Sequence, residues 1–411
     1  MSLATLKRAL GRVRHTRTAS SLGASPSKPY SWPEEPLDLP VDRNGGFYPA
    51  VPGTSLGSKY TVVRKLGWGV HSSVWLANDN SRDASLVAIK VLSAHATIAQ
   101  LSVSSELAHL QKITTKSRIR YGTTNAVHII TLLDHFHVES IHGRHLCLVN
   151  EVLGPDLGAL KEMLGLPRFP VDVVKRITRQ LLSALAFLHE DCEIIHTDLK
   201  PSNVQVTVDP KTLLEVDAQS DDILPGEFPF PPVISRPVVN AALSLQSCLN
   251  VKLLDFGTAT TFTGHHPETI QPYALRAPEV ILGCPWDSSA DIWNLGCMVF
   301  ELLTGSWLFK PHGGPIFTLK AYHLGHMGPV VGEDIRAETF ATGKHYSQYF
   351  RENGQLRIKI ADVQSLEVLL RLYAIEDISG SLSFLQSLLR LAPSDRQTAK
   401  SLLTHDWLNN L

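Results

Sequence analysis

The chain has 411 residues, of which 44% are hydrophobic and 19% are charged, and its formal net charge at pH 7 is −1. This composition is typical of a soluble globular protein with room for two or three domains, and it excludes a global field that would attract nucleic acid or an anionic membrane. The five cysteines are odd in number and lack a Cys-x-x-Cys spacing, which argues against disulfides and structural zinc. No uncharged apolar run approaches the ~20 residues that span a bilayer.

The N-terminal segment, residues 1–33, contains six Lys or Arg and no acidic residue. Four of its apolar side chains share one helical face, namely Leu3, Leu6, Leu10 and Val13. A basic, acid-poor, amphipathic start is typical of a mitochondrial transit peptide, and a disordered basic tail is the alternative that we favour. Residues 34–55 are rich in Pro and Gly and are predicted to be a linker.

Two β-branched, apolar runs, 59–66 and 73–77, flank the segment Gly67-Trp68-Gly69-Val70-His71-Ser72 and predict a hairpin. Glycines in such a turn let backbone N–H groups approach phosphate oxygens, although most Gly-x-Gly pairs are plain turns. The next predicted strand contains Val87-Ala88-Ile89-Lys90. Lys90 is then either a phosphate partner or a lysine whose end reaches water.

Helical spacing of apolar residues follows over 98–113 and includes Glu106, which we expect to pair with Lys90. Two more apolar strands are predicted over 127–135 and 145–152. Glu151-Val152-Leu153-Gly154 is then interpreted as a hinge, at which a mainly β lobe passes to a mainly helical one.

A strongly periodic helix is predicted over 171–190, and it leads into His196-Thr197-Asp198-Leu199-Lys200-Pro201-Ser202-Asn203. This segment places a carboxylate, an ammonium group and a carboxamide close together, as phosphoryl transfer to a hydroxyl requires. The Asp accepts the hydroxyl proton, the Lys offsets charge on the moving phosphoryl group, and the Asn holds Mg²⁺. Alone, the same string could be an ordinary turn after a helix.

A second carboxylate segment, Asp255-Phe256-Gly257, follows a predicted strand, and Asp255 lies 52 positions after Asn203. Two short strands and a turn need only ~12–15 residues. We therefore expect an insertion over about 209–246, rich in Pro, that loops out of the domain. Ala277-Pro278-Glu279, a helix over 288–304 and Arg396 complete the series of signatures.

These spaced segments, over residues 60–407, resemble in their order the signatures of eukaryotic protein kinases. Within that superfamily the chain is most similar to the SR-protein kinases, especially their compact fungal relatives. The strings that carry this resemblance are Lys65-Leu66-Gly67-Trp68-Gly69, Glu151-Val152-Leu153-Gly154, His196-Thr197-Asp198-Leu199-Lys200-Pro201 and Gly343-Lys344-His345-Tyr346-Ser347.

The resemblance implies an α+β, bilobal protein kinase fold. A basic tail and linker would span 1–55, and a small β-rich N-lobe with one main helix would span 56–150. A larger, mainly helical C-lobe would span 151–411, with the hinge at 151–154 and the insertion at about 209–246. It also implies a buried pair between Glu279 and Arg396.

Functional residues follow from the resemblance position by position. The residues implied to bind ATP are Leu66, Gly67, Gly69, Val74, Ala88, Lys90, Glu106, Glu151 and Leu153. Asp198 and Lys200 would be catalytic, and Asn203 and Asp255 would hold Mg²⁺. Pro272 departs from the pattern, because Ser/Thr kinases keep there a Thr whose hydroxyl bridges the catalytic Asp and Lys.

The implied function is an ATP- and Mg²⁺-dependent protein serine/threonine kinase that phosphorylates Ser in Arg/Ser-rich proteins of the splicing type. Alternatives are a pseudokinase or scaffold that binds nucleotide without efficient transfer, a LAMMER-type dual-specificity kinase, and a small-molecule phosphotransferase. We expect a monomer without direct nucleic-acid or membrane partners. It would be cytoplasmic, nuclear or both, with a mitochondrial location through the basic N-terminus as the alternative.

Overall fold

The computed structural model describes residues 34–82, 85–100, 105–122, 128–209, 213–214, 222–224, 230–240, 249–314 and 317–409. The predicted transit peptide or basic tail at 1–33 lies outside the described residues, as does much of the predicted insertion. The chain forms two compact units. The first comprises Met1–Ala99, Leu133–Leu166 and Val208–Ala242, and the second comprises Gln100–Leu132, Pro167–Thr207 and Leu243–Leu411. No helix among the described residues is long and apolar enough to cross a membrane.

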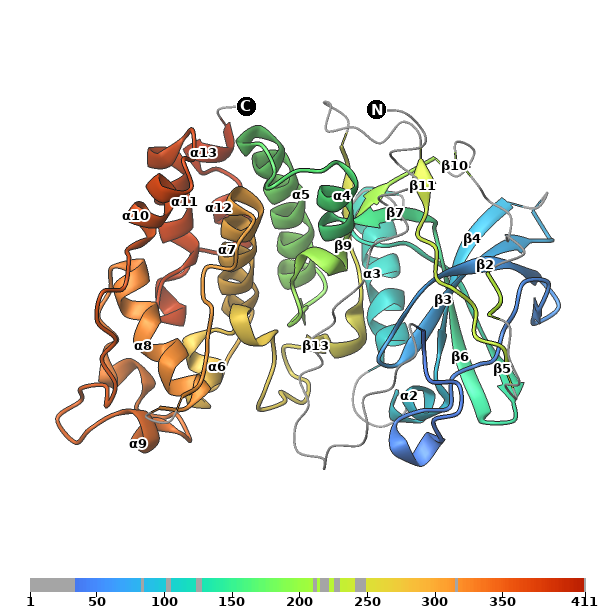
Figure 1. Ribbon diagram of the computed structural model, residues 1–411, viewed down its shortest axis with the longest axis horizontal. Coiled ribbons are helices and arrows are strands. Elements are labelled where there is room, and N and C mark those ends of the chain that lie inside the picture. Colours follow the sequence, from blue (N-terminus) through green and yellow to red (C-terminus); the bar gives the residue numbers. More distant parts are fainter. Residues whose placement is uncertain are drawn as a thin grey trace. The chain divides into compact units, whose positions relative to one another are not determined.

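The first unit is built on a six-stranded sheet in the order β1-β2-β3-β4-β6-β5. Strands β2 to β6 are labelled in Figure 1. The strands are β1 (Ser55–Leu56), β2 (Tyr60–Gly69), β3 (Ser72–Asp79), β4 (Ser85–Leu92), β5 (Leu132–Ser140) and β6 (Gly143–Asn150). Its other elements are α2 (Ala94–Ala99), β7 (Leu153–Asp156), α4 (Leu157–Met163), β10 (Leu213–Leu214) and β11 (Val239–Asn240). The predicted hairpin over 59–77 is thereby confirmed as β2 and β3.

The two faces of this sheet carry different clusters, because directly opposed residues of an antiparallel pair project to the same side. Trp75 lies opposite Ile89, and Ile89 opposite Val149, in one cluster of buried side chains. Ala88 lies opposite Leu76, in a second cluster on the other face. Register shifts in β2, between Val62/Arg64 and Lys65/Gly67, mark bulges that break the strict alternation of that strand.

The second unit is mainly helical, as the sequence predicts. Its long helices are α3 (Glu106–Tyr121), α5 (Val171–Glu190), α7 (Ser289–Thr304), α8 (Leu319–Val331) and α11 (Ile378–Leu388). Shorter ones are α6 (Pro278–Leu282), α9 (Tyr346–Tyr349), α10 (Leu366–Leu372), α12 (Ala399–Leu402) and α13 (Asp406–Asn409). Two short strand pairs flank the segments 196–203 and 255–257. They are β8 (Ile194–Ile195) with β13 (Thr260–Thr261), and β9 (Val204–Thr207) with β12 (Val251–Leu253).

Helices α5 and α7 form the core of this unit for different reasons. Helix α5 buries one stripe of apolar side chains, including Ile177, Leu181 and Leu185, at the spacing of an amphipathic helix. Helix α7 is buried over nearly its whole circumference, and even Asp291 and Asn294 are 0% exposed. Buried polar side chains need hydrogen-bond partners, so α7 is expected to anchor neighbouring loops.

The insertion does not loop out of the first unit in its described part, contrary to the prediction. Val233 belongs to the cluster around Trp75, and Val238 belongs to the cluster around Ala88 on the other face. The Arg236 backbone N–H donates to the Lys65 carbonyl oxygen over 3.0 Å. The segment therefore crosses β2 from one face of the sheet to the other and is part of the core.

A buried charge cluster fastens the same segment. The Lys65 side chain, which is 0% exposed, forms ion pairs with Glu34 (2.8 Å) and Glu35. It also donates to the Val233 carbonyl oxygen over 3.1 Å. Ser235 donates from its backbone N–H and its hydroxyl to the Glu34 carboxylate, each over 2.7 Å. The predicted linker at 34–55 is thus fixed at its start.

Candidate active site

The glycine-rich turn lies between β2 and β3, with Gly67 opposite Val74 and Gly69 opposite Ser72. A Cβ atom added to Gly67 or Gly69 would meet no atom within 4 Å. Protein packing therefore does not explain these two glycines. Open space above a backbone without side chains is what a phosphate chain needs in order to approach the N–H groups.

The remaining nucleotide-binding candidates of the first unit share one face of the sheet or follow its end. Leu66, Val74 and Ala88 pack in the same apolar cluster. Lys90 lies opposite Val74 and belongs to that face, because side chains alternate along β4. A flat apolar surface next to a lysine suits a base and its phosphates. After β6, Glu151 connects to Leu153, which begins β7 and is 6% exposed.

The catalytic-loop candidates of the second unit are brought together by direct hydrogen bonds. Lys200 Nζ donates to Asp198 Oδ2 over 2.6 Å. Asn203 Nδ2 donates to the same Oδ2 over 3.0 Å and to the Asp198 carbonyl oxygen over 2.8 Å. The amide nitrogen of Asn203 is thereby committed to Asp198, and its oxygen is the atom left to hold a metal. The three residues form one polar constellation that begins before η2 (Pro201–Asn203) and ends at its last residue.

Asp291 of α7 fixes the backbone that enters this loop. Its carboxylate accepts the backbone N–H of His196 (2.8 Å) and of Thr197 (2.9 Å), and it contacts His189 Nε2 at 2.9 Å. Burial alone would raise the pKa of the Asp291 carboxyl, but the hydrogen bond and charge of His189 hold it below its ordinary value. An ionised anchor with three partners keeps Asp198 in a defined position.

Thr197 has a positive φ of 69°, a conformation that β-branched residues rarely adopt. Its hydroxyl donates to the Thr258 carbonyl oxygen over 2.9 Å and contacts Thr258 Oγ1 at 3.2 Å. Thr258 ends η4 (Phe256–Thr258), which directly follows Asp255. Thr197 thus ties the catalytic loop to the second carboxylate segment. The sequence interpretation missed this role, which the adjacency of Thr197 to Asp198 could have suggested.

Asp255 and Glu106 both approach Gly257 on the side where a Cβ would stand. A Cβ added to Gly257 would sit 3.4 Å from Asp255 Oδ1 and 3.7 Å from Glu106 Oε2. The Leu254 backbone N–H also donates to the Asn203 carbonyl oxygen over 2.9 Å, which holds the two metal candidates on neighbouring backbone. An amide oxygen and a carboxylate are ligands that Mg²⁺ accepts. The predicted pairing of Glu106 with Lys90 stays a prediction.

Pro272 occupies the position at which Ser/Thr kinases keep a Thr, so it offers no hydroxyl to bridge Asp198 and Lys200. The structure joins Lys200 to Asp198 directly, so their contact does not depend on that hydroxyl. The residue before the proline, Gln271, has a φ of 69° and is 8% exposed. Its side chain donates to the Ala290 carbonyl oxygen (2.7 Å) and accepts the Ala277 N–H (2.8 Å). The segment is therefore held by Gln271, which the sequence interpretation did not single out.

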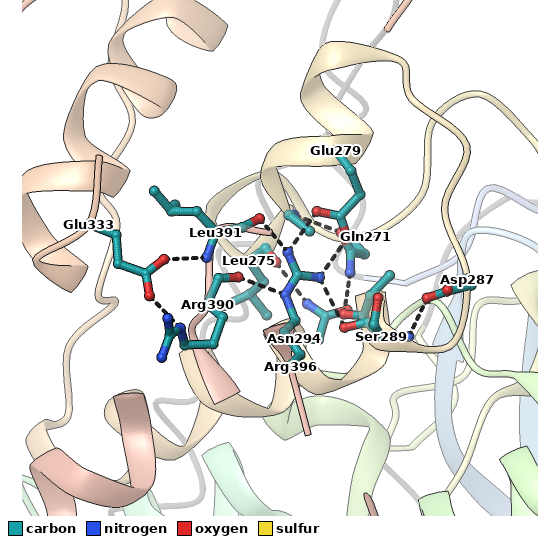
Figure 2. A network of polar contacts seen from close by, with 12 residues as sticks. Gln271, Leu275, Glu279, Asp287, Ser289, Asn294, Glu333, Arg390, Leu391 and Arg396 are labelled. Atoms are coloured by element: carbon teal, nitrogen blue, oxygen red, sulfur yellow. Dashed lines mark hydrogen bonds and ion pairs between the residues drawn. The ribbon is translucent and has the colours of Figure 1, made fainter. Parts of the chain in front are cut away.

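Glu279 and Arg396 form the predicted buried pair, shown in Figure 2. The two hydrogen bonds are parallel, from Nη1 to Oε1 (2.6 Å) and from Nη2 to Oε2 (2.8 Å). The guanidinium also donates to three carbonyl oxygens, those of Ser289, Arg390 and Leu391. The prediction of this pair is confirmed.

Comparisons with known proteins cover most of the chain. A family model described as protein kinase domain matches residues 60–408. The chain is 33% identical to "Serine/threonine-protein kinase SRPK" of Physarum polycephalum over 89% of each chain. It is 30% identical to "Protein kinase dsk1" of Schizosaccharomyces pombe, over 89% of this chain and 84% of the relative. A solved structure, the kinase domain of PF14_0431, aligns with a TM-score of 0.65 and 26% identity over 88% of this chain and 99% of that one.

Proposed function

The chain belongs to the protein kinase family and, within it, to the SRPK-type serine/threonine kinases, and from this premise we propose that it phosphorylates Ser in Arg/Ser-rich proteins. Membership confirms the predicted bilobal kinase fold and the predicted serine/threonine kinase activity. A protein kinase domain implies ATP as the phosphoryl donor. The observation that carries the mechanism is the constellation of Asp198, Lys200 and Asn203, joined through one carboxylate oxygen.

Asp198 would accept the proton of the acceptor hydroxyl. At the same time the hydroxyl oxygen would bond to the γ-phosphorus, and the bond between the γ-phosphorus and the departing ADP oxygen would break. Lys200 would offset the negative charge on the phosphoryl group during transfer. Asn203 and Asp255 would hold Mg²⁺, which would neutralise phosphate charge when bound. In the first unit, Gly67, Gly69 and Lys90 would hold the phosphates, and the apolar face would hold the base.

A pseudokinase is disfavoured by what the chain keeps. Lys90, Asp198, Asn203 and Asp255 are all present, and the described contacts of Asp198 leave its carboxylate held by two donors. A carboxylate in that arrangement is held in position beside the acceptor hydroxyl that the mechanism requires. The hydrogen bond between Lys200 and Asp198 also forms without a bridging hydroxyl at position 272, so Pro272 does not argue against phosphoryl transfer.

The decisive experiment is a Mg-ATP phosphorylation assay on an Arg-Ser repeat peptide, beside an acidic peptide and a Pro-directed peptide. We expect phosphorylation of the Arg-Ser peptide and a turnover that falls by ~10²–10⁴ in Asp198→Ala, the usual effect of removing a positioned acid–base group. Asp172→Ala, at a 63% exposed carboxylate on α5, is the matched control and should leave turnover unchanged. Equal turnover of Asp198→Ala and wild type would remove Asp198 from the mechanism. Preference for another peptide would refute the substrate class.

The proposal includes a monomer in the cytoplasm, the nucleus or both. It rests on the kinase assignment and on the five cysteines, whose odd number and spacing favour a reducing compartment. The alternative, mitochondrial import through residues 1–33, is tested by fusing that segment to a fluorescent reporter. Import with cleavage of the reporter would replace the proposal, whereas a diffuse signal would support it.

A further inference from the structure

Asn150 is a buried polar residue at the end of β6, where it is 5% exposed. Its amide nitrogen Nδ2 donates a long hydrogen bond of 3.4 Å to the Leu148 carbonyl oxygen. Its oxygen Oδ1 is buried and has no hydrogen-bond partner among the described residues. A buried acceptor without a donor destabilises a protein, so an apolar side chain would suit this strand better when no ligand is bound.

The strand register decides which face of the sheet Asn150 occupies. It lies opposite Ala88 of β4, and opposed residues of an antiparallel pair project to the same side. Lys90, two residues further along β4, is on that side as well. The orphaned oxygen therefore belongs to the face that carries the proposed phosphate lysine and the apolar cluster of Leu66, Val74 and Ala88. The opposite face of β6 carries Cys147 and Val149, which pack in the other core cluster.

The Leu148 carbonyl determines how the amide of Asn150 is oriented. Rotating the amide by 180° would bring Oδ1 against that carbonyl oxygen, and two acceptors would then face each other without a proton. The orientation with Nδ2 toward Leu148 is thus favoured, and the group left to meet a ligand is an acceptor. What Asn150 lacks is an N–H or O–H donor.

Purine bases differ in what they offer to such an acceptor. Adenine carries an amino group at C6, which is a donor, whereas guanine carries an oxygen there, which is an acceptor. A site whose polar group is satisfied by one ligand and left unpaired by another discriminates strongly between them. A 6-amino purine fits Oδ1 of Asn150, and a 6-oxo purine does not.

We propose that Asn150 determines base specificity at the ATP site by accepting a hydrogen bond from the 6-amino group of adenine. The inference rests on the proposed function, because it takes the face of β3, β4 and β6 that bears Lys90 as the nucleotide-binding face. Asn150 then trades stability of the nucleotide-free protein for selectivity toward adenine nucleotides.

The test compares three nucleotides in the wild-type protein and in Asn150→Leu by calorimetry without peptide. The nucleotides are ATP, inosine triphosphate with a 6-oxo group, and purine riboside triphosphate with hydrogen at C6. Other groups can also contact the base, so the decisive quantity is the ratio of the Kd for purine riboside triphosphate to the Kd for ATP. We expect this ratio to fall about tenfold in Asn150→Leu, which corresponds to about 1.4 kcal/mol.

Two further measurements separate base reading from a structural role. The melting temperature of nucleotide-free Asn150→Leu should equal or exceed that of the wild type, because the unpaired acceptor is replaced by an apolar group of similar size. Val149→Ala, on the opposite face of β6, is the control. It should lower the melting temperature, because it opens a core cavity, and leave the Kd ratio unchanged.

An unchanged Kd ratio together with a lower melting temperature in Asn150→Leu would overturn the inference, since it would assign Oδ1 to a structural water. If that variant does not fold, equal affinity of the wild type for ATP and purine riboside triphosphate would overturn it as well. If the protein phosphorylates the Arg-Ser peptide but the Kd ratio is the same in Asn150→Leu as in the wild type, only the role of Asn150 in base specificity is refuted. Absence of any nucleotide binding would refute the proposed function itself.

Discussion

Two buried charge clusters, one in each unit, hold together segments that are far apart in the sequence, but their charges do not balance in the same way. In the second unit, Arg396 meets one carboxylate, that of Glu279, in a parallel, two-bond arrangement. In the first unit, Lys65 meets two carboxylates, those of Glu34 and Glu35. The cluster of Arg396 and Glu279 has one positive and one negative group. The cluster of Lys65 has one positive group and two carboxylates.

Burial changes the proton affinity of Glu35. Burial raises the pKa of the Glu35 carboxyl above its ordinary value of 4.5, although the charge of Lys65 acts in the opposite direction. Glu34 shares its charge with two donors of Ser235. The Arg396–Glu279 pair therefore depends on both of its members. The Lys65 cluster can lose one of its two carboxylates and still keep one negative charge for its one positive charge.

The largest effect is expected for Glu279→Gln. This change keeps the shape of the side chain but leaves the Arg396 guanidinium buried without a counter-ion, and a guanidinium cannot lose its proton to escape. We expect the free energy of unfolding of the second unit to fall by about 3–5 kcal/mol. Urea denaturation combined with hydrogen exchange in α7 measures it. Glu367→Gln, which breaks an exposed pair with Arg371, is the control, and a similar small loss in both variants would contradict the prediction.

Lys65→Met comes next, because it leaves two carboxylates without their base. Unlike a guanidinium, a buried carboxyl can take up a proton, which limits the penalty. Methionine also keeps most of the volume of the buried stem. We expect a loss of about 1–3 kcal/mol, the cost of unsatisfied buried polar groups, with faster hydrogen exchange in β2 and in residues 230–240. Unchanged exchange in both segments would show that the cluster does not fasten the insertion.

Ser235→Ala removes one of the hydrogen bonds between the insertion and Glu34. The backbone N–H of residue 235 still donates to that carboxylate, so a loss of about 1 kcal/mol is expected. The measurement is again urea denaturation, together with the Kd for ATP, because the insertion hydrogen-bonds to the backbone of Lys65, two residues before Gly67. A matched substitution, Ser383→Ala in α11 of the second unit, should leave hydrogen exchange in β2 unchanged. A loss larger than that of Lys65→Met would reverse the assigned importance of the two residues.

The smallest effect, and one of opposite sign, is expected for Glu35→Gln. Because the folded-state pKa of Glu35 is raised, the native protein binds more protons than the unfolded chain between 4.5 and that raised value. The stability contributed by Glu35 is therefore greatest at low pH and is lost as pH rises through the raised pKa. Glu35→Gln should remove this slope and leave stability at neutral pH unchanged or slightly higher. A large loss at neutral pH would show that Lys65 needs both acids.

Most of the catalytic site could be predicted from the sequence, because its residues lie in short segments of the chain. Asp198, Lys200 and Asn203 lie within six positions, so a single loop brings them together, and their predicted proximity follows directly. The hairpin of β2 and β3 was predictable because its strands are adjacent in the chain and separated by glycines. The pair of Glu279 and Arg396 spans 117 positions, and it was accessible only through the family resemblance.

The tertiary structure alone decided the charge cluster and the packing of the insertion. Lys65 finds its partners 30, 31 and 168 positions away, and no local pattern encodes such a meeting. Arg64 lies opposite Leu76 and Lys65 opposite Trp75, so the two side chains take opposite faces of the sheet. Both are nevertheless buried, 3% and 1% exposed, and each donates to a carbonyl oxygen of the insertion, that of Arg236 or that of Val233. Sequence periodicity determines which face of the sheet a side chain takes, but whether that face is covered depends on segments that arrive from elsewhere in the chain.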